Sequence, residues 1–538
     1  MSRPPDVPRR DRPRPVYRRA DLIRLLAPTS IAVVGASPNP DSFAGRTVGN
    51  LDGFRGRLWR VNSRYERIGD EVCYPSLQAL PEAPDCVVVA IAKERVEPII
   101  DEAIAAGAGG AIVFASGYAE TGKTEDIALQ QRLAPRVAGS PLRLIGPNCI
   151  GIANVPLGLS ASFMFTPRFL APTRPALGLV SQSGALGFAL AQASERGVAF
   201  SHLLTAGNSA DVDVADEVAY LAEDPACSAI VCLFEGMADP GRMFEAAAAA
   251  RAAGKPLVMY KIASGEQGAA AAMSHTGSLA GSKAAWSAAF ERHGIIEVDC
   301  FEALLETASF FAKAPALPAA DGVAVLATSG GAAIIAADVA ERHGVPLPQP
   351  SAEVATVLAA EIPDFGSARY PCDVTAQVLN SPESLRRCAS ALLGDPAFCL
   401  LLYPAVYAND AVAARQSVFD QLARNSGKLV LMIWMTQWFE GTGAAEAERL
   451  DHVVTFHSMD RALAAVAAWQ RRARHATRLA DAAPPWVASE GARKAVARQL
   501  AAARPTGILT EREAKALLTH YGLPVVGERL ATTRGQAI

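Results

Sequence analysis

His275 lies in a run of mostly small residues, Met273 to Ser282, that supplies glycines and hydroxyl side chains. Such a loop leaves the imidazole little steric cover and surrounds it with backbone N–H and hydroxyl donors, the groups that bind phosphate oxygens. An imidazole is also largely neutral near pH 7 and is nucleophilic. The run therefore predicts a histidine that carries a phosphoryl group, and a capping histidine for the helix expected from Lys283 is the competing interpretation.

A second segment has complementary chemistry. Residues 178–187 join a short apolar strand, ending at Val180, to a helix expected from Ala185. Free N–H groups at such a helix start, together with the hydroxyls of Ser181 and Ser183, form a phosphate site that needs no cation. The spacing thus predicts an anion site that could receive the phosphoryl group.

Glu235 ends a third informative segment, Ile230 to Gly236, because it follows an apolar run that reads as a buried strand. A carboxylate there can hold one ring nitrogen of His275 as N–H and leave the other as the nucleophile. A helix or loop cap is the competing interpretation of Glu235. Lys261 follows a later expected strand. Its ammonium group can bind an anionic acyl phosphate or form an ion pair with an acidic side chain, and the sequence does not decide between these two roles.

Three strings carry a resemblance to a known family: SQSGALG at 181–187, FEG at 234–236 and MSHTGSLAGS at 273–282. In this order they resemble the NDP-forming acyl-CoA synthetases, relatives of succinyl-CoA ligase in which a histidine shuttles phosphate between an acyl phosphate and a nucleoside diphosphate. The resemblance places His275 on the phosphorylated histidine and Glu235 on the carboxylate that steadies it. The residues that it places on the phosphate-receiving helix start are Ser181, Ser183 and Gly184. It extends from about Leu22 to the C-terminus.

Composition excludes several classes of function. The chain has 538 residues, half of them hydrophobic, which indicates roughly three or four domains. A net charge of -3 supplies no basic field for nucleic acid. The nine cysteines form no CxxC pair and fit reduced thiols in a cytoplasmic protein. No apolar run reaches the roughly 18 residues of a membrane helix, so no membrane contact is expected.

The order of elements predicts the fold class. Short apolar strands alternate with helical runs from Asp21 onward, which is typical of α/β proteins with parallel sheets. Together with the resemblance, this predicts three Rossmann- or flavodoxin-like open parallel-sheet domains in tandem, followed by a truncated ATP-grasp start. The expected parts are a disordered leader (1–20), a CoA-binding Rossmann-like domain (21–155), a succinyl-CoA-ligase-like flavodoxin domain with the phosphohistidine (170–315), a second ligase-like flavodoxin domain (320–472), a linker (473–506) and an incomplete ATP-grasp start (507–538).

The first expected strand, at residues 30–34, ends in the glycine turn of Gly35, which resembles a nucleotide-type turn between strand and helix. The family resemblance implies that this domain binds the 3′-phospho-ADP portion and pantetheine arm of CoA. The residues that it places at the coenzyme are Gly35, Ser37, Ser42 and Gly45 at the phosphates, Asn62 and Arg64 at the nucleotide end, and Lys93, Ser116, Gly117 and Tyr118 along the rest. Arg64 stands where the family usually has lysine after proline, and a merely solvated Arg64 is the alternative.

Asp211 and Asp213 follow an expected strand and offer carboxylates to a metal ion. Both also suit the N-cap of the helix that follows, and this is the favoured interpretation. The sequence therefore predicts no metal site.

The resemblance implies an acid–thiol ligase that interconverts acyl-CoA, phosphate and ADP with a carboxylic acid, CoA and ATP through acyl phosphate and phosphohistidine. CoA is a substrate, and ATP or ADP with Mg²⁺ would act only through an ATP-grasp domain or subunit, within a homo- or hetero-oligomer. The alternatives are a CoA- or acyl-CoA-binding regulatory module, a fragment inactive without its ATP-grasp domain, and an NAD-dependent dehydrogenase. The turn after Val34 lacks GxGxxG and therefore disfavours the dehydrogenase. The acyl substrate is not readable from the sequence.

Overall fold

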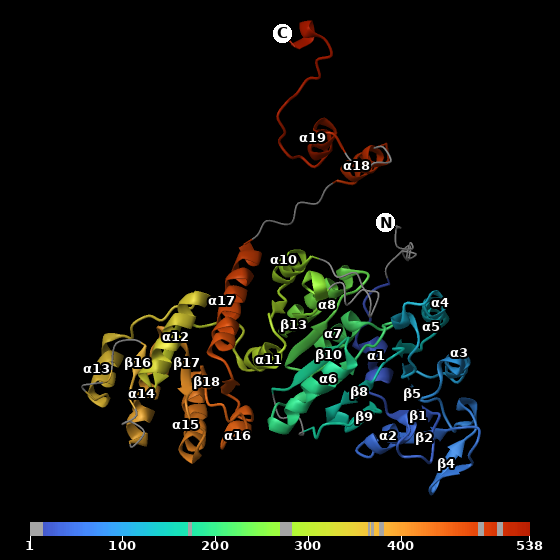
Figure 1. Cartoon of the computed structure of the whole chain (residues 1–538), viewed down its shortest axis with the longest axis horizontal. Helices are drawn as coiled ribbons and strands as arrows, with labels where there is room; N and C mark the ends of the chain where they lie inside the picture. The colour runs from blue at the N-terminus through green and yellow to red at the C-terminus, as the bar shows by residue number, and fades with distance from the viewer. Residues whose placement is uncertain are drawn as a thin grey trace. The chain divides into compact units, whose positions relative to one another are not determined.

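The computed structural model describes residues 14–169, 175–268, 282–363, 366, 371–375, 381–481, 489–502 and 509–537 (Figure 1). The predicted phosphorylated residue His275 lies outside these ranges. Residues 1–473 form one compact unit and residues 474–538 a second. Three largely parallel sheets with flanking helices build the first unit, which confirms the predicted α/β class with open parallel sheets in tandem.

The first sheet has the strand order β3-β4-β2-β1-β5-β6-β7 and is parallel except for the β3–β4 pair. Its strands are β1 (Ser30–Val34), β2 (Arg57–Val61), β3 (Arg67–Ile68), β4 (Glu71–Tyr74), β5 (Cys86–Val89), β6 (Gly110–Val113) and β7 (Arg143–Ile145). Its helices are α1 (Arg19–Leu26), α2 (Phe43–Asn50), α3 (Val96–Ala105), α4 (Thr124–Gln131) and α5 (Leu133–Ala138). Short β-branched runs such as β1 and β5 form its centre because a parallel strand is buried on both faces.

The second sheet has the order β14-β13-β12-β10-β11-β8-β9. Its strands are β8 (Gly151–Asn154), β9 (Leu159–Ser162), β10 (Leu177–Ser181), β11 (Phe200–Thr205), β12 (Ala229–Phe234), β13 (Leu257–Lys261) and β14 (Ile296–Glu297). Its helices are α6 (Gly184–Ala191), α7 (Val214–Glu223), α8 (Pro240–Ala252), α10 (Lys283–His293) and α11 (Ala303–Lys313). The hairpin of β8 and β9 pairs antiparallel with the edge of β11, so residues just after the first sheet complete the second one.

The third sheet has the order β16-β15-β17-β18-β19 and is parallel. Its strands are β15 (Gly322–Ala327), β16 (Cys372–Asp373), β17 (Phe398–Ala405), β18 (Leu429–Trp434) and β19 (Val453–Phe456). Its helices are α12 (Gly330–His343), α13 (Ala352–Glu361), α14 (Pro382–Gly394), α15 (Asp410–Ser426), α16 (Ala444–Glu448) and α17 (Met459–Asp481). Buried Glu306 on α11 accepts hydrogen bonds from His457 and Arg461, which ties the second sheet's helix to the third domain.

The second unit contains α18 (Glu490–Ala502), α19 (Glu511–His520) and α20 (Arg534–Ala537). The sequence predicts Thr510 as the N-cap of the helix that follows it, and Thr510 caps α19. Glu513 completes a capping box. Within the described stretch 509–537 the structure contains no strand, and the incomplete ATP-grasp start expected at 507–538 stays a prediction. In the described part of the chain, no helix combines the length and the apolar character that a membrane crossing requires.

The segment from Arg14 to Arg18 is packed rather than disordered, so the predicted leader ends earlier than residue 20. Val16 is buried, and the backbone N–H of Tyr17 donates to Asp216 Oδ1 at 2.7 Å. The phenol of Tyr17 donates to Asp211 Oδ1 at 3.1 Å. The partners lie about 200 positions away on α7 and the loop before it, and such distant pairings leave no local pattern.

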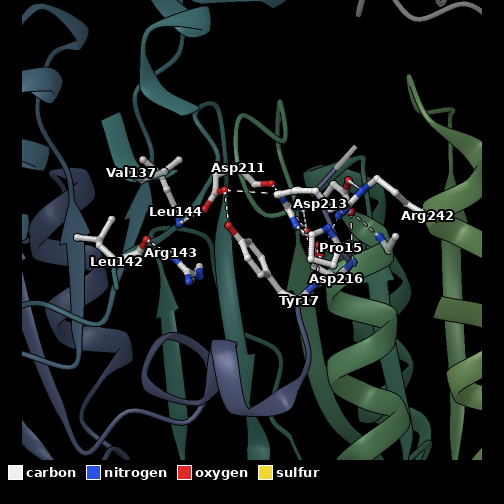
Figure 2. Close-up of polar contacts among 12 residues, drawn as sticks. Pro15, Tyr17, Val137, Leu142, Arg143, Leu144, Asp211, Asp213, Asp216 and Arg242 are labelled. Carbon is white, nitrogen blue, oxygen red and sulfur yellow. Dashed lines mark hydrogen bonds and ion pairs between the residues drawn. The ribbon is translucent and has the colours of Figure 1, made fainter. Parts of the chain in front are cut away.

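Two arginines and three aspartates form a buried ionic network beside this segment (Figure 2). Arg242 on α8 donates to Asp213 Oδ2 at 2.9 Å and to Asp216 Oδ1 at 2.7 Å. Arg14 also pairs with Asp216, and its backbone oxygen accepts from Arg242 at 2.7 Å. Asp211 accepts from the backbone N–H of Leu144 on β7 at 3.1 Å. The network therefore joins the N-terminal segment, the edge of the first sheet and two helices of the second domain.

Glu217 on α7 is a fully buried carboxyl group, and neither of its oxygens has a hydrogen-bond partner among the described residues. Burial raises the pKa of Glu217 well above its usual value, and the nearby charges of Asp213 and Asp216 raise it further. Burial and the two neighbouring carboxylates thus both favour the neutral form of the side chain.

Replacement of Arg242 by alanine should lower the free energy of unfolding by about 3–5 kcal/mol, because it removes a buried cation from Asp213 and leaves Asp216 with Arg14 as its remaining ion-pair partner. Chemical denaturation monitored by circular dichroism measures the change. Arg386→Ala, which breaks an exposed pair with Glu383 on one helix, is the matched control and should leave stability nearly unchanged. Equal effects of the two substitutions would contradict a stabilising role for the buried network.

Replacement of Glu217 by leucine should stabilise the protein more at pH 8 than at pH 4.5. The folded-state pKa of Glu217 lies above its unfolded value, so stability is lost as the pH rises from the unfolded pKa through the folded one. The gain at pH 8 should be of order 1–3 kcal/mol, the cost of an unsatisfied buried polar group. Chemical denaturation at both pH values tests this. Glu217→Gln, which is similar in size but cannot ionise, shows how much of the effect comes from the charge. A gain that is the same at both pH values would refute the ionisation argument.

Candidate functional site

The turn between β10 and α6 contains the predicted phosphate residues. Ser181 ends β10 and is buried, and its hydroxyl donates to the backbone oxygen of Ser183 at 2.6 Å. Ser183 is the N-cap of α6, but its own side chain forms no capping hydrogen bond. Gly184 and Ala185 follow as the first residues of the helix, so their N–H groups are not used by a side-chain cap. This helix start has the donor set of an anion site.

Gln182 connects this turn to the turn that carries Glu235. The side-chain oxygen of Gln182 accepts from the backbone N–H groups of Glu235, at 2.6 Å, and Gly236, at 3.1 Å. Its side-chain nitrogen donates to the backbone oxygen of Gly236 at 2.8 Å. One amide group thus fixes the position of Glu235 against the start of α6. The sequence singles out the serines on either side of Gln182 and misses Gln182 itself, whose side-chain amide offers both donors and an acceptor oxygen.

Lys261 holds the Glu235 turn from the neighbouring strand. It ends β13, is buried, and is paired in register with Phe234 at the end of β12. Its ammonium group donates to the backbone oxygens of Glu235 and, at 2.6 Å, Ile262. Burial lowers the pKa of Lys261, and the nearby charge of Glu235 opposes that change. The cation therefore stabilises the turn beneath Glu235 in this structure.

The described residues on both sides of the His275 segment belong to this part of the sheet. Ile262 donates its backbone N–H to the oxygen of Phe234 at 3.0 Å, so the chain leaves β13 beside the Glu235 turn. It re-enters the described part at Ser282, the N-cap of α10. The role of His275 stays a prediction, since residues 269–281 are outside the described residues.

The turn after β1 brings together the predicted phosphate residues of the first domain. Gly35 has a φ of +89°, and a Cβ atom there would lie 2.5 Å from the backbone oxygen of Ala90. The turn therefore requires glycine. Ser42 is the N-cap of α2 and its hydroxyl accepts from the N–H of Gly45 at 3.0 Å. The hydroxyl of Ser37 accepts from the backbone N–H two residues on, and the side chain is half-buried.

Asn62 and Arg64 follow β2, the neighbour of β1. The side chain of Asn62 donates to the backbone oxygen of Ala36 at 2.7 Å and accepts from the N–H of Arg64 at 3.0 Å. Asn62 thus fixes the two turns against each other. The side chain of Arg64 is exposed, a placement compatible with a phosphate contact and with simple solvation.

The other residues predicted to contact the coenzyme follow β5 and β6, and they differ in how far they are buried. Lys93 donates to Asp126 at 2.7 Å and to the backbone oxygen of Gly117 at 2.9 Å. The hydrogen bond with Asp126 raises the pKa of Lys93. Ser116 is exposed, whereas Tyr118 is fully buried in the core of the first domain. The ring of Tyr118 offers a ligand no surface, so only its backbone remains a candidate contact.

Asn208, in the turn after β11, joins the second domain to the first. Its side-chain nitrogen donates to Glu120 and, at 2.9 Å, to Gln130. Its side-chain oxygen accepts from Asn148 at 3.2 Å. Glu120 also accepts from the N–H of Gly117 at 2.6 Å, so the predicted coenzyme loop and the second domain share one hydrogen-bond network. The sequence treats this turn only as a cap or metal candidate and does not reveal the link.

The two aspartates after β11 have structural partners. Asp213 is the N-cap of α7 and accepts from the N–H groups of Ala215 and Asp216, which confirms the capping prediction for Asp213. Asp211 accepts from Leu144 and Tyr17. Across the described ranges, no group of three or more His, Cys, Asp or Glu side chains is placed to hold a metal ion.

Two family models match the chain. Residues 29–155 match the model of a CoA binding domain, and residues 174–311 match that of a succinyl-CoA ligase like flavodoxin domain. These ranges contain the strands of the first and second sheets except β9, together with every site residue predicted above.

Among curated proteins, the chain is 35% identical over 352 residues to the ADP-forming acetate–CoA ligase I of Archaeoglobus fulgidus, which covers 65% of this chain and 50% of that protein. It is 30% identical over 421 residues to the alpha subunit of the ADP-forming acetate–CoA ligase II of Pyrococcus furiosus, which covers 76% of this chain and 88% of the subunit. The chain therefore spans about half the length of the first relative and most of the second.

Among solved structures, the fold is similar to that of the dinucleotide-forming acetyl-coenzyme A synthetase 1 of Candidatus Korarchaeum cryptofilum in complex with phosphate and ADP. The TM-score is 0.75 at 28% sequence identity, and the match covers 86% of this chain and 99% of that chain. The similarity therefore extends over all three sheets and is not limited to one domain.

Proposed function

The chain belongs to the family of ADP-forming acyl-CoA synthetases, and we propose that it carries the acyl-transfer and histidine-phosphorylation steps of that reaction. In the first step, phosphate attacks the thioester carbonyl of an acyl-CoA, releasing CoA and giving an acyl phosphate. In the second, His275 attacks the phosphorus, the carboxylate leaves, and phosphohistidine forms. Transfer to ADP then yields ATP, and the sequence of steps is reversible.

The observation that carries the proposal is the link made by Gln182. It joins the uncapped start of α6, a site for phosphoryl oxygens, to Glu235, a carboxylate for the imidazole of His275. The chain enters the His275 segment beside the same turn. Glu235 would hold one ring nitrogen as N–H, and the amides of Gly184 and Ala185 would hold phosphoryl oxygens, so positioning and dipoles supply most of the catalysis.

The first domain is proposed as the CoA site, and its residues fit an anionic coenzyme. The Gly35 turn requires glycine, because a side chain there would collide with Ala90, and the turn precedes the start of α2. The start of α2, beside Ser37 and Ser42, would meet the phosphates. Asn62 and Arg64 would meet the nucleotide end, and Lys93, Ser116 and Gly117 the arm. Since Asp126 already pairs with Lys93, a ligand phosphate would compete with that carboxylate.

The nucleotide step is proposed to use an ATP-grasp domain or partner subunit, which would supply the site for ADP or ATP and Mg²⁺. Several relatives are named as alpha subunits, which supports a partner of this kind. The steps assigned to this chain need no metal, because amide dipoles and a neutral imidazole act on the phosphoryl group. We further propose a cytoplasmic enzyme that works as a homo- or hetero-oligomer.

Incubation with radiolabelled acetyl phosphate, or with acyl-CoA and radiolabelled phosphate, should give the chain an acid-labile, base-stable label. The label should be absent from His275→Ala, because a phosphoramidate on that imidazole is the proposed intermediate. His275→Asn should bind CoA as the unaltered chain does, since other loops build the coenzyme site. A chain that binds CoA but takes no label under either condition would be a regulatory module instead.

Replacement of Gln182 by alanine should slow phosphohistidine formation roughly 10- to 100-fold, because the backbone turn that carries Glu235 loses its hydrogen bonds to the residue before Ser183. Rapid quenching and gel quantification of the label measure the rate, with Glu235→Gln as the reference variant. Gln182→Glu keeps the acceptor oxygens and should recover part of the rate.

The matched control is Gln470→Ala, which removes a buried glutamine bonded to the backbone of Asp321 in the third domain. It should lower stability without slowing the labelling of folded protein. If the two alanine variants slow labelling alike, the link through Gln182 has no special role.

A further inference from the structure

The side chain of Asn208 uses both of its donor hydrogens and its oxygen at the boundary between the first two domains. Its nitrogen donates to Glu120 and, at 2.9 Å, to Gln130, and its oxygen accepts from Asn148 at 3.2 Å. The side chain of Gln130 also donates to the backbone oxygen of Asn208 at 3.4 Å. An asparagine amide offers two donor hydrogens and one acceptor oxygen, so the three partners together match its full set of groups. All three partners belong to the first domain.

Two of these partners also bind residues 116–120, which we call the coenzyme loop because the resemblance places the arm of CoA there. Glu120 accepts from the N–H groups of Gly117, at 2.6 Å, and of the next residue, at 3.1 Å. Gln130 accepts from the following N–H group of the loop at 3.2 Å. The oxygens of Glu120 and Gln130 that accept from Asn208 therefore also hold the backbone of the coenzyme loop. The position of the loop depends on where Asn208 lies.

The turn that carries Asn208 borders residues 181–184, the phosphate turn. The strands β10 and β11 before these two turns are paired in parallel up to Ser181. Directly after β11, the N–H of Ala206 donates to the backbone oxygen of Ser181 at 3.1 Å. The hydroxyl of Ser181 donates to the backbone oxygen of Ser183, the N-cap of α6. Since Asn208 lies two positions after Ala206, a short series of hydrogen bonds connects the coenzyme loop to the start of α6.

The backbone of the same turn has its own contacts with the first domain. The N–H groups of Asn208 and Ala210 donate to the backbone oxygens of Pro147 and Gly146, at 2.9 Å each. Gly207 has a φ of +58°, and a Cβ atom there would lie 2.5 Å from the oxygen of Pro147. This close approach requires glycine. Because these backbone contacts remain when the side chain of Asn208 is shortened, a substitution there should shift the coenzyme loop without unfolding the turn.

We propose that Asn208 is a positioning residue that aligns the coenzyme thioester with the phosphate that attacks it. This rests on the proposed function, in which the arm of CoA lies along the coenzyme loop and phosphate lies at the start of α6. An oxygen of hydrogen phosphate bonds to the carbonyl carbon, the carbon–sulfur bond breaks, and the departing sulfur takes up the proton of the phosphate as the thiol of CoA.

The two reactants of this step are held by different domains, so its rate depends on their alignment. A displacement of about 1 Å can cost about 100-fold in rate. The transfer from an acyl phosphate to His275 involves no coenzyme and should not depend on Asn208. The proposal therefore assigns Asn208 to one of the two steps and not to the other.

Two labelling routes of the full chain test this assignment: radiolabelled acetyl phosphate, and saturating acetyl-CoA with radiolabelled phosphate. Asn208→Ala should slow the acetyl-CoA route about 10- to 100-fold and the acetyl phosphate route less than about twofold. The affinity for CoA, measured by isothermal titration, should change less than about threefold, since a slower step at saturation without weaker binding indicates lost alignment. Asn208→Asp, which places a carboxylate against Glu120, should slow the acetyl-CoA route at least as much, and adding Glu120→Gln should recover part of the rate.

The matched control is Asn50→Ala. Asn50, at the end of α2, also joins the two domains, by donating to the backbone oxygens of Ser162 and Met164 at 2.7 Å each. These bonds involve neither the coenzyme loop nor the phosphate turn, so the ratio of the two labelling rates should change less than about twofold.

The role of Asn208 would be overturned if Asn208→Ala slowed both routes equally or slowed neither. An equal selective loss of the acetyl-CoA route in Asn50→Ala would overturn it as well, because any link between the domains would then suffice. Label from acetyl phosphate but none from acetyl-CoA in the unaltered chain would show that this chain does not align the two sites. Absence of label by both routes would instead overturn the proposed function, so the two failures are distinguished.

Discussion

The side-chain amide of Gln182 is the contact on which the arrangement of the candidate site depends. Two turns that end separate parallel strands can shift independently unless something joins them, and this amide joins them through three hydrogen bonds. A carboxylate would lack the donor and a lysine would lack the acceptor. Lys261 supports the same turn from the next strand, so the position of Glu235 is set from both sides of β12.

The relation between the first two domains follows from polar contacts of the same kind. Asn208 connects the turn after β11 to the loop that carries Gly117, and Asp211 connects it to β7 and the N-terminal segment. Both residues belong to a single turn of the second sheet. A coenzyme bound to the first domain would therefore meet the start of α6 in a geometry fixed by few groups, and buried charges there make the geometry costly to change.

The sequence predicts the sheets well because parallel strands are buried on both faces and read as short apolar runs such as Ser30–Val34 and Cys86–Val89. It also predicts local caps, since the partners of Asp213 and Thr510 lie within three residues. It fails where the partner is remote. Tyr118 matches a coenzyme motif yet packs in the core, and nothing near Arg14 reveals its pairing with Asp216. Gln182 is missed for the same reason.

Among the described residues at the Glu235 turn, the one lysine is already bound to the backbone, which affects how the turn can hold a phosphoryl group. In the described residues of this turn, the ammonium of Lys261 is occupied by backbone oxygens, and burial lowers its pKa. A phosphoryl group at the start of α6 would then meet mainly amide dipoles. Dipoles bind an anion less tightly than a buried ammonium does, and a site that holds phosphate loosely favours transfer in both directions.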